Sequence, residues 1–292
     1  MVRFFKGRNE GAFDGAITLL LILVLIIVLI PLWYVLMVSL APLARGAPEN
    51  RLFLAPADWS FEAYKQLLNQ PNFLRAALNS LSITVSGTAL NMFLTVLTAY
   101  PLSRKSLPGR NLIVTAILFT FLFNAGLIPT YLVVKDLGLL NKLPAVILPG
   151  AISVYNLLVM KSFFQNLPEG LEEAARMDGA NDFQVLWHVV LPLSRPILLT
   201  IGLFYAVGHW NEFFLPLLYL NDNALMPLPV LLRNILIAAS MAEYAESNVV
   251  SATSLESLKM AAVVLTTIPM LLIYPWIQRH FTRGMLIGGV KE

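Results

Sequence analysis

Long apolar runs constrain this chain more than any other feature, because each run has enough residues to cross the hydrocarbon core of a bilayer. A membrane-spanning helix needs about 20 predominantly apolar residues. Six runs reach this length, and they cover residues 16–40, 77–102, 112–134, 143–164, 197–220 and 260–277. Charged residues make up only 13% of the chain, about half the share found in soluble domains. We therefore expect an all-α polytopic membrane protein with six transmembrane helices in one domain over residues 1–292. A soluble enzyme, a secreted disulfide scaffold and a disordered chain are excluded.

Basic residues precede the first apolar run, as they would in a signal peptide that is later cleaved. These residues are Arg3, Lys6 and Arg8. The apolar segment of a signal peptide has about 7–15 residues. The run over residues 16–40 is longer and has no clear cleavage site of small residues, which favours a retained helix.

The distribution of Lys and Arg indicates on which side of the membrane the chain ends lie. Six spans put both ends on one side, and if that side is the cytoplasm, twelve of the 20 Lys and Arg residues are cytoplasmic. The densest group is Arg104, Lys105 and Arg110, between the second and third spans, with no acidic residue nearby. Short cytoplasmic loops carry an excess of these residues. We therefore expect cytoplasmic N- and C-termini.

Two segments between spans on the opposite side are expected to contain short helices. Residues 61–68 have an amphipathic pattern and follow Ser60, a residue favoured at helix N-caps. Residues 228–239 are expected to form an interfacial helix.

The connection between the fourth and fifth spans, residues 166–196, carries clear helix start and stop signals. Pro168 suits the first turn of a helix, and Gly179 suits the left-handed residue at which many helices end. Asn181 and Gln184 have the spacing of a capping box at the start of a second helix, which Pro192 is expected to close. This segment is predicted to be a helical hairpin.

The predicted hairpin is acidic, with five acidic residues against two arginines. The acids are Glu169, Glu172, Glu173, Asp178 and Asp182. Such a charge does not suit a helix pair lying on anionic lipid headgroups, and helices of about ten residues need tertiary partners to be stable. The hairpin therefore either docks on another protein in the cytoplasm or caps the helical bundle. Composition leaves both alternatives open.

The hairpin contains a motif that resembles the signature of permease subunits of ABC importers. The matching residues are Glu173, Ala174, Ala175, Gly179, Val189, Leu191 and Pro192. Val189 stands where that family usually has Ile, which is a mild departure. The chain also resembles the maltose-type, carbohydrate-uptake branch of the family at residues 178–180, 79–80, 210–213 and 281–284.

The resemblance implies that residues 166–196 are a coupling loop whose helix sits in a cleft of a cytoplasmic ATPase subunit. Glu172 or Glu173 would pair with basic residues in the cleft, Ala174 and Ala175 would permit a close approach, and Gly179 would set the turn. The coupling residues implied in this way are Glu172, Glu173, Ala174, Ala175, Asp178, Gly179, Leu191 and Pro192.

The resemblance also implies the partners and the location of the chain. The partners would be two ATPase subunits that bind ATP and Mg, a second and non-identical permease subunit, and an extracytoplasmic solute-binding protein that delivers a carbohydrate. The expected location is the bacterial cytoplasmic (inner) membrane, in which the chain would be a multi-pass protein in contact with lipid.

Motifs for catalysis are absent from the sequence. It has no G-x-x-x-x-G-K-[ST] phosphate loop, no H-E-x-x-H metal helix and no G-x-S-x-G nucleophile turn. It also has no cysteine, and its three histidines are far apart in sequence. We expect no catalytic residue, metal site, cofactor or nucleic-acid partner for this chain, so that ATP hydrolysis belongs to partner subunits.

Glu212 is the one clear acid within the predicted apolar spans. An acid at the bilayer centre costs about 2.5–3.5 kcal/mol on insertion scales, so Glu212 should not face lipid. Together with His209, Trp210 and Asn211, it could line the path of a sugar, and Asn124 is a weaker candidate for the same path. Alternatively, Glu212 could form an interhelical hydrogen bond that fixes packing.

Two other functional classes remain to be weighed against an ABC permease. An ion- or proton-coupled secondary carrier would have several intramembrane acids or bases and an inverted repeat, and a membrane-embedded enzyme would have a cluster of catalytic side chains. Within the carbohydrate branch, residues 226–237 resemble permeases of oligosaccharide and polysaccharide importers, including alginate-type systems. Arg233 in this stretch could meet an acidic sugar, or it could anchor at lipid headgroups.

Overall fold

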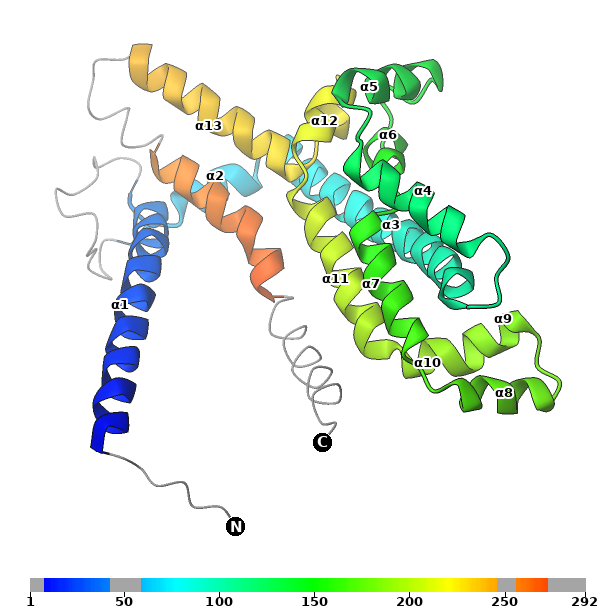
Figure 1. Ribbon diagram of the computed structural model, residues 1–292. Helices are drawn as coiled ribbons and strands as arrows, with labels where there is room; N and C mark the ends of the chain where they lie inside the picture. Colours follow the sequence, from blue (N-terminus) through cyan, green and yellow to red (C-terminus); the bar gives the residue numbers. More distant parts are fainter. Residues whose placement is uncertain (1–7, 43–58, 246–255, 273–292) are drawn as a thin grey trace. The chain divides into compact units, whose positions relative to one another are not determined.

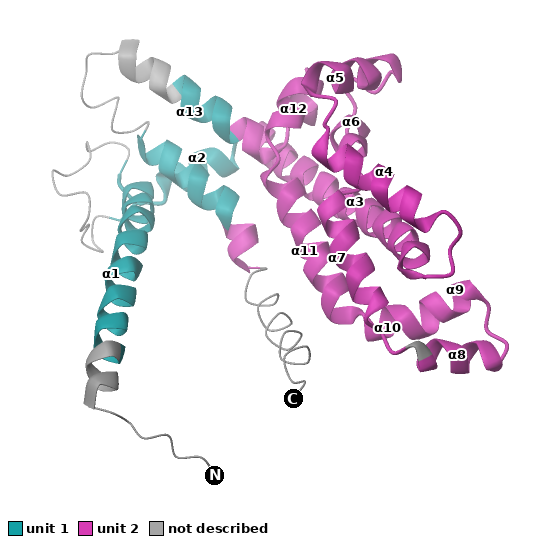
Figure 2. Cartoon of the chain, viewed as in Figure 1, with its two compact units in different colours: residues 1–70, 232–267 teal, residues 71–231, 268–292 magenta. Residues whose placement is uncertain are grey.

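The computed structural model describes residues 8–42, 59–245 and 256–272, and the regular structure in these ranges is helical, with no strand (Figure 1). The chain divides into two compact units (Figure 2). One unit comprises residues 1–70 and 232–267, and the other comprises residues 71–231 and 268–292. Each unit is described on its own below.

The first unit contains α1 (Arg8–Ser39), the most apolar helix of the described chain. Its large apolar side chains are exposed along most of its length, as expected for a helix whose solvent is lipid. Its C-terminal end is packed, and there the Ser39 hydroxyl lies 2.6 Å from the Tyr64 hydroxyl. Five residues earlier, Tyr34 donates a hydrogen bond of 2.7 Å to the carboxylate of Glu256. Glu256 begins a helix over residues 256–272.

Tyr64 belongs to α2 (Glu62–Leu68), the short helix predicted over residues 61–68. The helix begins one residue later than predicted, so Phe61 and not Ser60 is its N-cap. The Ser60 hydroxyl still accepts a hydrogen bond of 3.3 Å from the Glu62 N–H. Burial raises the pKa of Tyr64, and the hydrogen bond with Ser39 opposes this shift. The other predicted short helix, residues 228–239, is the first part of α13 (Leu228–Ala245).

The second unit is built around α3 (Pro71–Ser103), an unbroken helix of 33 residues that covers the predicted span 77–102. The helices α7 (Val154–Gln165) and α11 (Arg195–Asn211) pack along it. Their shared core consists of fully or almost fully buried residues, among them Ala99, Leu157, Met160, Ile201 and Tyr205.

The predicted span 112–134 is not one straight helix. It contains α4 (Arg110–Leu122) and α5 (Leu127–Asp136), which are bent by 111° relative to each other. Gly126 precedes α5 with a φ of 88°, a value that glycine adopts without steric cost. The Asn124 side chain accepts a hydrogen bond of 2.8 Å from the Gly126 N–H and so stabilises the turn.

Two further predicted spans are also interrupted. The span 143–164 consists of α6 (Pro144–Ile147), the 3₁₀ turn η2 (Leu148–Gly150) and α7, with a bend of 53° before α7. The span 197–220 consists of α11 and α12 (Phe214–Tyr219), separated by a break at residues 212–213. The sixth predicted span, 260–277, is helical as far as residue 272 and then lies outside the described residues.

Two described helices are long and apolar enough to cross a membrane alone, and the number rises to at most five if each bent helix pair is one span. The six-span organisation therefore stays a prediction.

Candidate functional site

The acidic hairpin predicted from the sequence lies at one end of the second unit and begins with α8 (Glu169–Met177). Gly179 follows this helix with a φ of 87°, in the left-handed region. The N–H groups of Gly179 and Ala180 donate 3.0 Å hydrogen bonds to the carbonyls of Arg176 and Ala175. This is the Schellman pattern, in which a glycine lets the chain turn while the last carbonyls of the helix keep partners. The predicted stop at Gly179 is thus confirmed.

The second arm of the hairpin starts at α9 (Asp182–Val185), with the capping box predicted at Asn181 and Gln184. The Asn181 side chain accepts a hydrogen bond of 2.9 Å from the Gln184 N–H, and the Asn181 N–H donates one of 2.8 Å to the Gln184 side chain. The arm continues through the π-helical turn η3 (Leu186–Val190) and α10 (Leu191–Leu193). It then bends by 84° into α11.

Pro192 was expected to close this arm, but the arm continues helically to Leu193. The missing N–H of proline is tolerated in the first turn after a change of helix type, and the π-helical turn supplies that change. The actual break lies at Ser194, whose side chain is fully buried.

The inner side of the hairpin is fixed to the helical bundle by apolar packing. Val185, Leu186 and Val190 are at most 4% exposed and belong to the same core as the α7 residues Leu157 and Met160. Ala175 packs against this core from α8. Since each arm is too short to be stable alone, this packing gives both arms the tertiary partner that they need.

The two adjacent glutamates of α8 point to different surroundings. Glu172 is 6% exposed, and its Oε2 lies 2.5 Å from Nη1 of Arg104, the residue that follows α3. The Arg104 guanidinium also covers the Tyr100 ring, with 4.5 Å from Cζ to the ring centroid. Glu173, in contrast, is exposed. Of the two glutamates proposed for contact with a partner protein, only Glu173 therefore faces outward.

The hairpin exposes several large apolar side chains. Met177 is 88% exposed, Phe183 is 75% exposed and Trp187 is 69% exposed. Exposed Ala174 and Asp178 accompany them. Aromatic and methionine side chains of this kind are enriched where proteins meet. Their four-residue spacing at positions 183 and 187 was the available signal, because such residues lie on one face of a helix.

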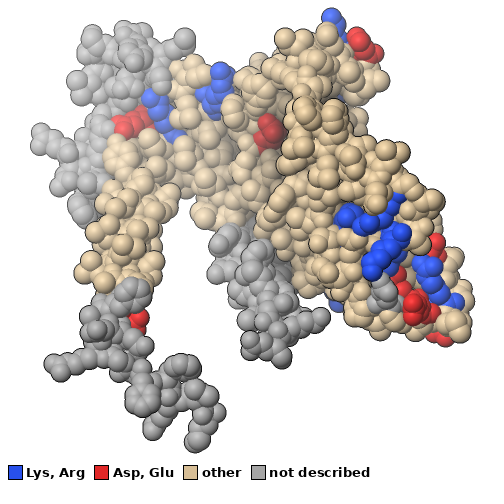
Figure 3. All heavy atoms as spheres, in the orientation of Figure 1, with Lys and Arg blue, Asp and Glu red and all other residues tan. Residues whose placement is uncertain are grey.

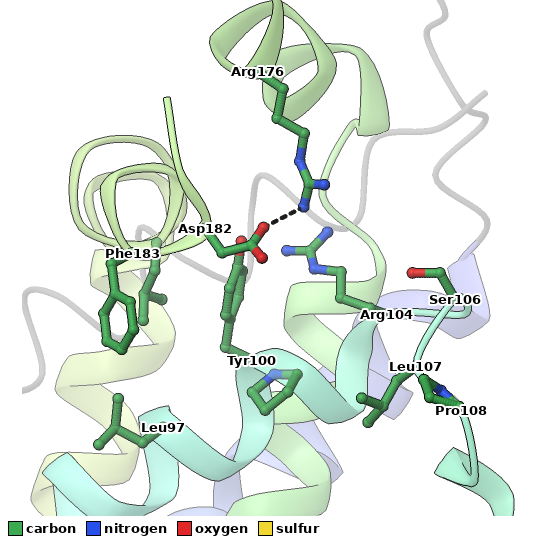
Figure 4. Close-up of a pocket in the computed structure, with 11 residues that line it drawn as sticks. Leu97, Tyr100, Arg104, Ser106, Leu107, Pro108, Arg176, Asp182 and Phe183 are labelled. Carbon is green, nitrogen blue, oxygen red and sulfur yellow. Dashed lines mark hydrogen bonds and ion pairs between the residues drawn. The ribbon is translucent and has the colours of Figure 1, made fainter. Parts of the chain in front are cut away.

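A cavity of about 400 Å³ separates the hairpin from the end of α3 (Figure 4). Figure 4 shows the guanidinium groups of Arg104 and Arg176 directed toward the same space beside Tyr100. Arg176 Nη2 pairs with Asp182 Oδ1 at 2.8 Å, and both side chains are more than half exposed. Phe183 and Leu107 supply apolar walls. On the face shown in Figure 3, acidic and basic side chains gather at this end of the unit.

Glu212 lies at the break between α11 and α12, where its role is local. Its Oε1 accepts hydrogen bonds from the N–H groups of Phe214 (2.9 Å) and Leu215 (3.1 Å). A carboxylate in this position satisfies N–H groups that a helix start leaves without intrahelical partners. The structure therefore gives Glu212 a helix-capping role that neither of the two sequence-based alternatives contained.

The three residues before Glu212 differ in their surroundings, and a sugar path along His209, Trp210 and Asn211 stays a prediction. Trp210 is 8% exposed, whereas Asn211 is exposed. His209 Nε2 lies 3.0 Å from the side-chain amide of Asn91 on α3. Asn124, the remaining candidate for the sugar path, lies at the α4–α5 turn described above.

A column of polar contacts, which the sequence analysis missed, links α3 with α11 and α7. Thr95 and Tyr205 share a hydrogen bond of 2.7 Å, and the Tyr205 hydroxyl accepts another of 3.1 Å from the Ser153 N–H. Gly87, Asn91 and Thr95 lie at four-residue spacing on α3 and are all buried. Small and polar residues at this spacing let membrane helices approach closely and hydrogen-bond to each other.

Within the described ranges, residues 8–42, 59–245 and 256–272, no group of three or more His, Cys, Asp or Glu side chains could hold a metal ion.

Comparison with known proteins places this architecture in context. The family model described as "Binding-protein-dependent transport system inner membrane component" matches residues 16–287. Protein LplC of Bacillus subtilis (strain 168) is 44% identical over 96% of this chain and 95% of its own length. The polygalacturonan/rhamnogalacturonan transport system permease protein YtcP of the same organism is 43% identical over 96% of this chain and 98% of its own length.

Among solved structures, the chain is similar to one from a bacterial ABC transporter involved in the import of the acidic polysaccharide alginate. The TM-score is 0.86 and the sequence identity is 32%, over 96% of this chain and all of that chain.

Proposed function

The chain belongs to the family of binding-protein-dependent transport system inner membrane components, and from this we propose that it is a permease subunit of an ATP-driven carbohydrate importer. The observation that carries the proposal is the hairpin over residues 169–193. It is anchored on its inner side and presents Glu173, Ala174, Met177 and Asp178 on its outer side.

The outer side of the hairpin suits a cleft in a partner ATPase subunit. Ala174 has a small side chain, so a partner can approach the α8 backbone closely, and Glu173 offers an exposed carboxylate to a basic residue of the cleft. On the same helix, Met177 adds a large exposed apolar side chain. Burial of such side chains is the main favourable term in most protein association.

ATP-driven movement would pass from the ATPase subunits through the hairpin into the helical bundle. Closure of two ATPase subunits around ATP and Mg would displace the hairpin, and its packed inner side would carry this displacement to α7 and α11. The hairpin side would then be cytoplasmic. Both chain termini would be cytoplasmic as well, if the six-span prediction holds. A second permease subunit and an extracytoplasmic solute-binding protein complete the proposed assembly.

Oligosaccharides or polysaccharides are the proposed substrates, and acidic ones are favoured among them. The names of two similar proteins support this, because YtcP is named for polygalacturonan and rhamnogalacturonan and the solved transporter for alginate. An ion- or proton-coupled carrier is less well supported, since Glu212 is the one clear acid in the predicted spans. Its carboxylate is already engaged as a helix cap.

The proposed function is tested by reconstitution. The chain is co-expressed with the ATPase and permease genes that accompany it, purified, and placed in proteoliposomes with the cognate solute-binding protein. We expect the ATPase subunit to co-purify and labelled oligosaccharide uptake to require ATP. The variant E173K should remain in the membrane but lose ATPase binding and uptake, because the exposed charge is reversed. The matched control E62K reverses the charge of an exposed acid at the start of α2 and should transport normally.

Two results would contradict the proposal. One is uptake that depends on a proton or sodium gradient and not on ATP. The other is E173K with parental uptake and a bound ATPase.

A further inference from the structure

We propose that the ion pair between Arg104 and Glu172 is the joint through which the hairpin moves α3, so that Arg104 is a positioning residue for coupled transport. This inference deepens the proposed function and rests on it. The joint, called the Arg104–Glu172 latch below, consists of these two side chains and the Tyr100 ring beneath the guanidinium.

The latch joins α8 to α3, the longest described helix of the second unit. Glu172 lies on the inner side of α8, and Arg104 directly follows the last residue of α3. The corner after α3 is fixed as well, because Arg110 Nε donates a hydrogen bond of 2.8 Å to the Leu102 carbonyl. A displacement of α8 is therefore applied at a rigid end of α3, and not at a loose loop.

At its other contacts, α3 is connected to the helices that would have to move during transport. Its stripe of Gly87, Asn91 and Thr95 contacts His209 and Tyr205 of α11. Since α11 directly follows the hairpin in sequence, the hairpin acts on this helix pair at two points. It is linked covalently to α11 and through the latch to α3.

The geometry of the latch suits a movable joint better than a fixed one. Glu172 contacts Nη1 of Arg104, whereas Nε and Nη2 are buried and have no hydrogen-bond partner among the described residues. A guanidinium presents five donors in a planar fork, so the carboxylate can shift from one nitrogen to another while the ion pair persists. A lysine, which has a single nitrogen, could not provide such a shift.

A second ion pair on the same hairpin serves as the internal control. The side chains of Arg176 and Asp182 are 51% and 71% exposed, whereas the side chains of Arg104 and Glu172 are 22% and 7% exposed. Exposed ion pairs contribute little to stability, but removing one partner of a buried ion pair leaves an uncompensated charge in the protein. Both pairs are in the hairpin region, so a general effect of charge removal would appear in both.

The test uses the reconstituted complex and four variants: E172Q, R104K, the double variant R104E/E172R, and the control D182N. Uptake and ATP hydrolysis are measured together, and hydrogen–deuterium exchange of residues 169–177 is measured in the complete complex. For E172Q we expect uptake per ATP to fall at least about tenfold while the ATPase stays bound and residues 169–177 exchange faster. R104K should show a smaller fall in uptake per ATP than E172Q. The double variant should recover part of the coupling, and D182N should stay within about twofold of the parental complex.

The outcomes separate the latch from the proposed function. If the parental chain binds no ATPase, the proposed function fails, and the latch falls with it. If the parental complex is active and E172Q couples normally, the latch alone is overturned. The latch is also overturned if E172Q loses uptake only because it no longer binds the ATPase. It is likewise overturned if the double variant R104E/E172R is as uncoupled as E172Q.

Discussion

Gly87 is the position at which the packing of α3 against α11 leaves no space for a side chain. A Cβ at this position would lie 2.6 Å from Nε2 of His209 and 2.8 Å from two further atoms of the same ring. The imidazole would have to turn away, and it would then lose its contact with Asn91. We therefore expect G87A to destabilise the second unit.

The loss of stability expected for G87A is best expressed relative to the same substitution at a matched glycine. Gly202 lies on α11, and a Cβ there would meet Met92 Sδ at 3.8 Å, an ordinary contact. Both substitutions replace glycine by alanine within a helix, so the gain in helix propensity, up to about 1 kcal/mol, cancels in the comparison. Overpacking costs about 1–3 kcal/mol, which is the expected difference between the two variants. By the scaling for domains of 150–250 residues, it corresponds to roughly 2–12 °C in Tm.

The assay is thermal unfolding of the detergent-solubilised chain, followed by the loss of its monodisperse peak in size-exclusion chromatography. G87A should have the lower Tm, and G202A should match or exceed the parental value. The double variant G87A/H209A should lose less stability than the sum of its two single variants, because the shortened side chain makes room for the new methyl group. Equal Tm values for G87A and G202A would show that the close approach of α3 to His209 is incorrect.

Three further substitutions test local features of the second unit. G179A should reduce uptake more than G170A. Gly179 has a φ of 87°, at which a side chain causes strain of about 1–3 kcal/mol, whereas Gly170 lies within α8. Equal uptake by the two variants would contradict this prediction. E212A should remove the cap of α12 and lower stability by about 0.5–2 kcal/mol, with transport per folded molecule unchanged. A normal Tm with abolished uptake would instead place Glu212 in the sugar path. Y205F should cost about 1–3 kcal/mol because Thr95 and the Ser153 N–H lose their shared partner, and an unchanged Tm would argue against the polar column.

Local signals in the sequence were sufficient to predict the turn and the second helix start of the hairpin. Gly179 and the Asn181 capping box act on backbone groups within a few residues, so their chemistry can be identified without knowing the tertiary structure. The different roles of Glu172 and Glu173 could not be predicted in this way. The partner of Glu172 is Arg104 on another element, and two adjacent glutamates look alike until that contact is known.

The interrupted spans have a related explanation. A hydropathy window averages over about 19 residues, and the residues on both sides of the α4–α5 bend are apolar, so the window shows no gap. The bend between α4 and α5 depends on the backbone conformation of Gly126 and on packing that hydropathy does not record. Likewise, the buried stripe of Gly87, Asn91 and Thr95 can be found in the sequence at four-residue spacing, but its contacts with His209 and Tyr205 require the fold.

Site-directed crosslinking gives the most direct test of whether the hairpin is held by an ATPase subunit. The chain has no cysteine, so a single cysteine can be placed at Met177, which is 88% exposed on the hairpin, or at Leu132 on α5, which is 47% exposed. We predict that M177C, and not L132C, forms a crosslink to the ATPase subunit in native membranes, and that ATP changes its yield. Failure of M177C to capture that subunit, or its labelling by a membrane-impermeant maleimide added outside intact cells, would contradict the proposed coupling.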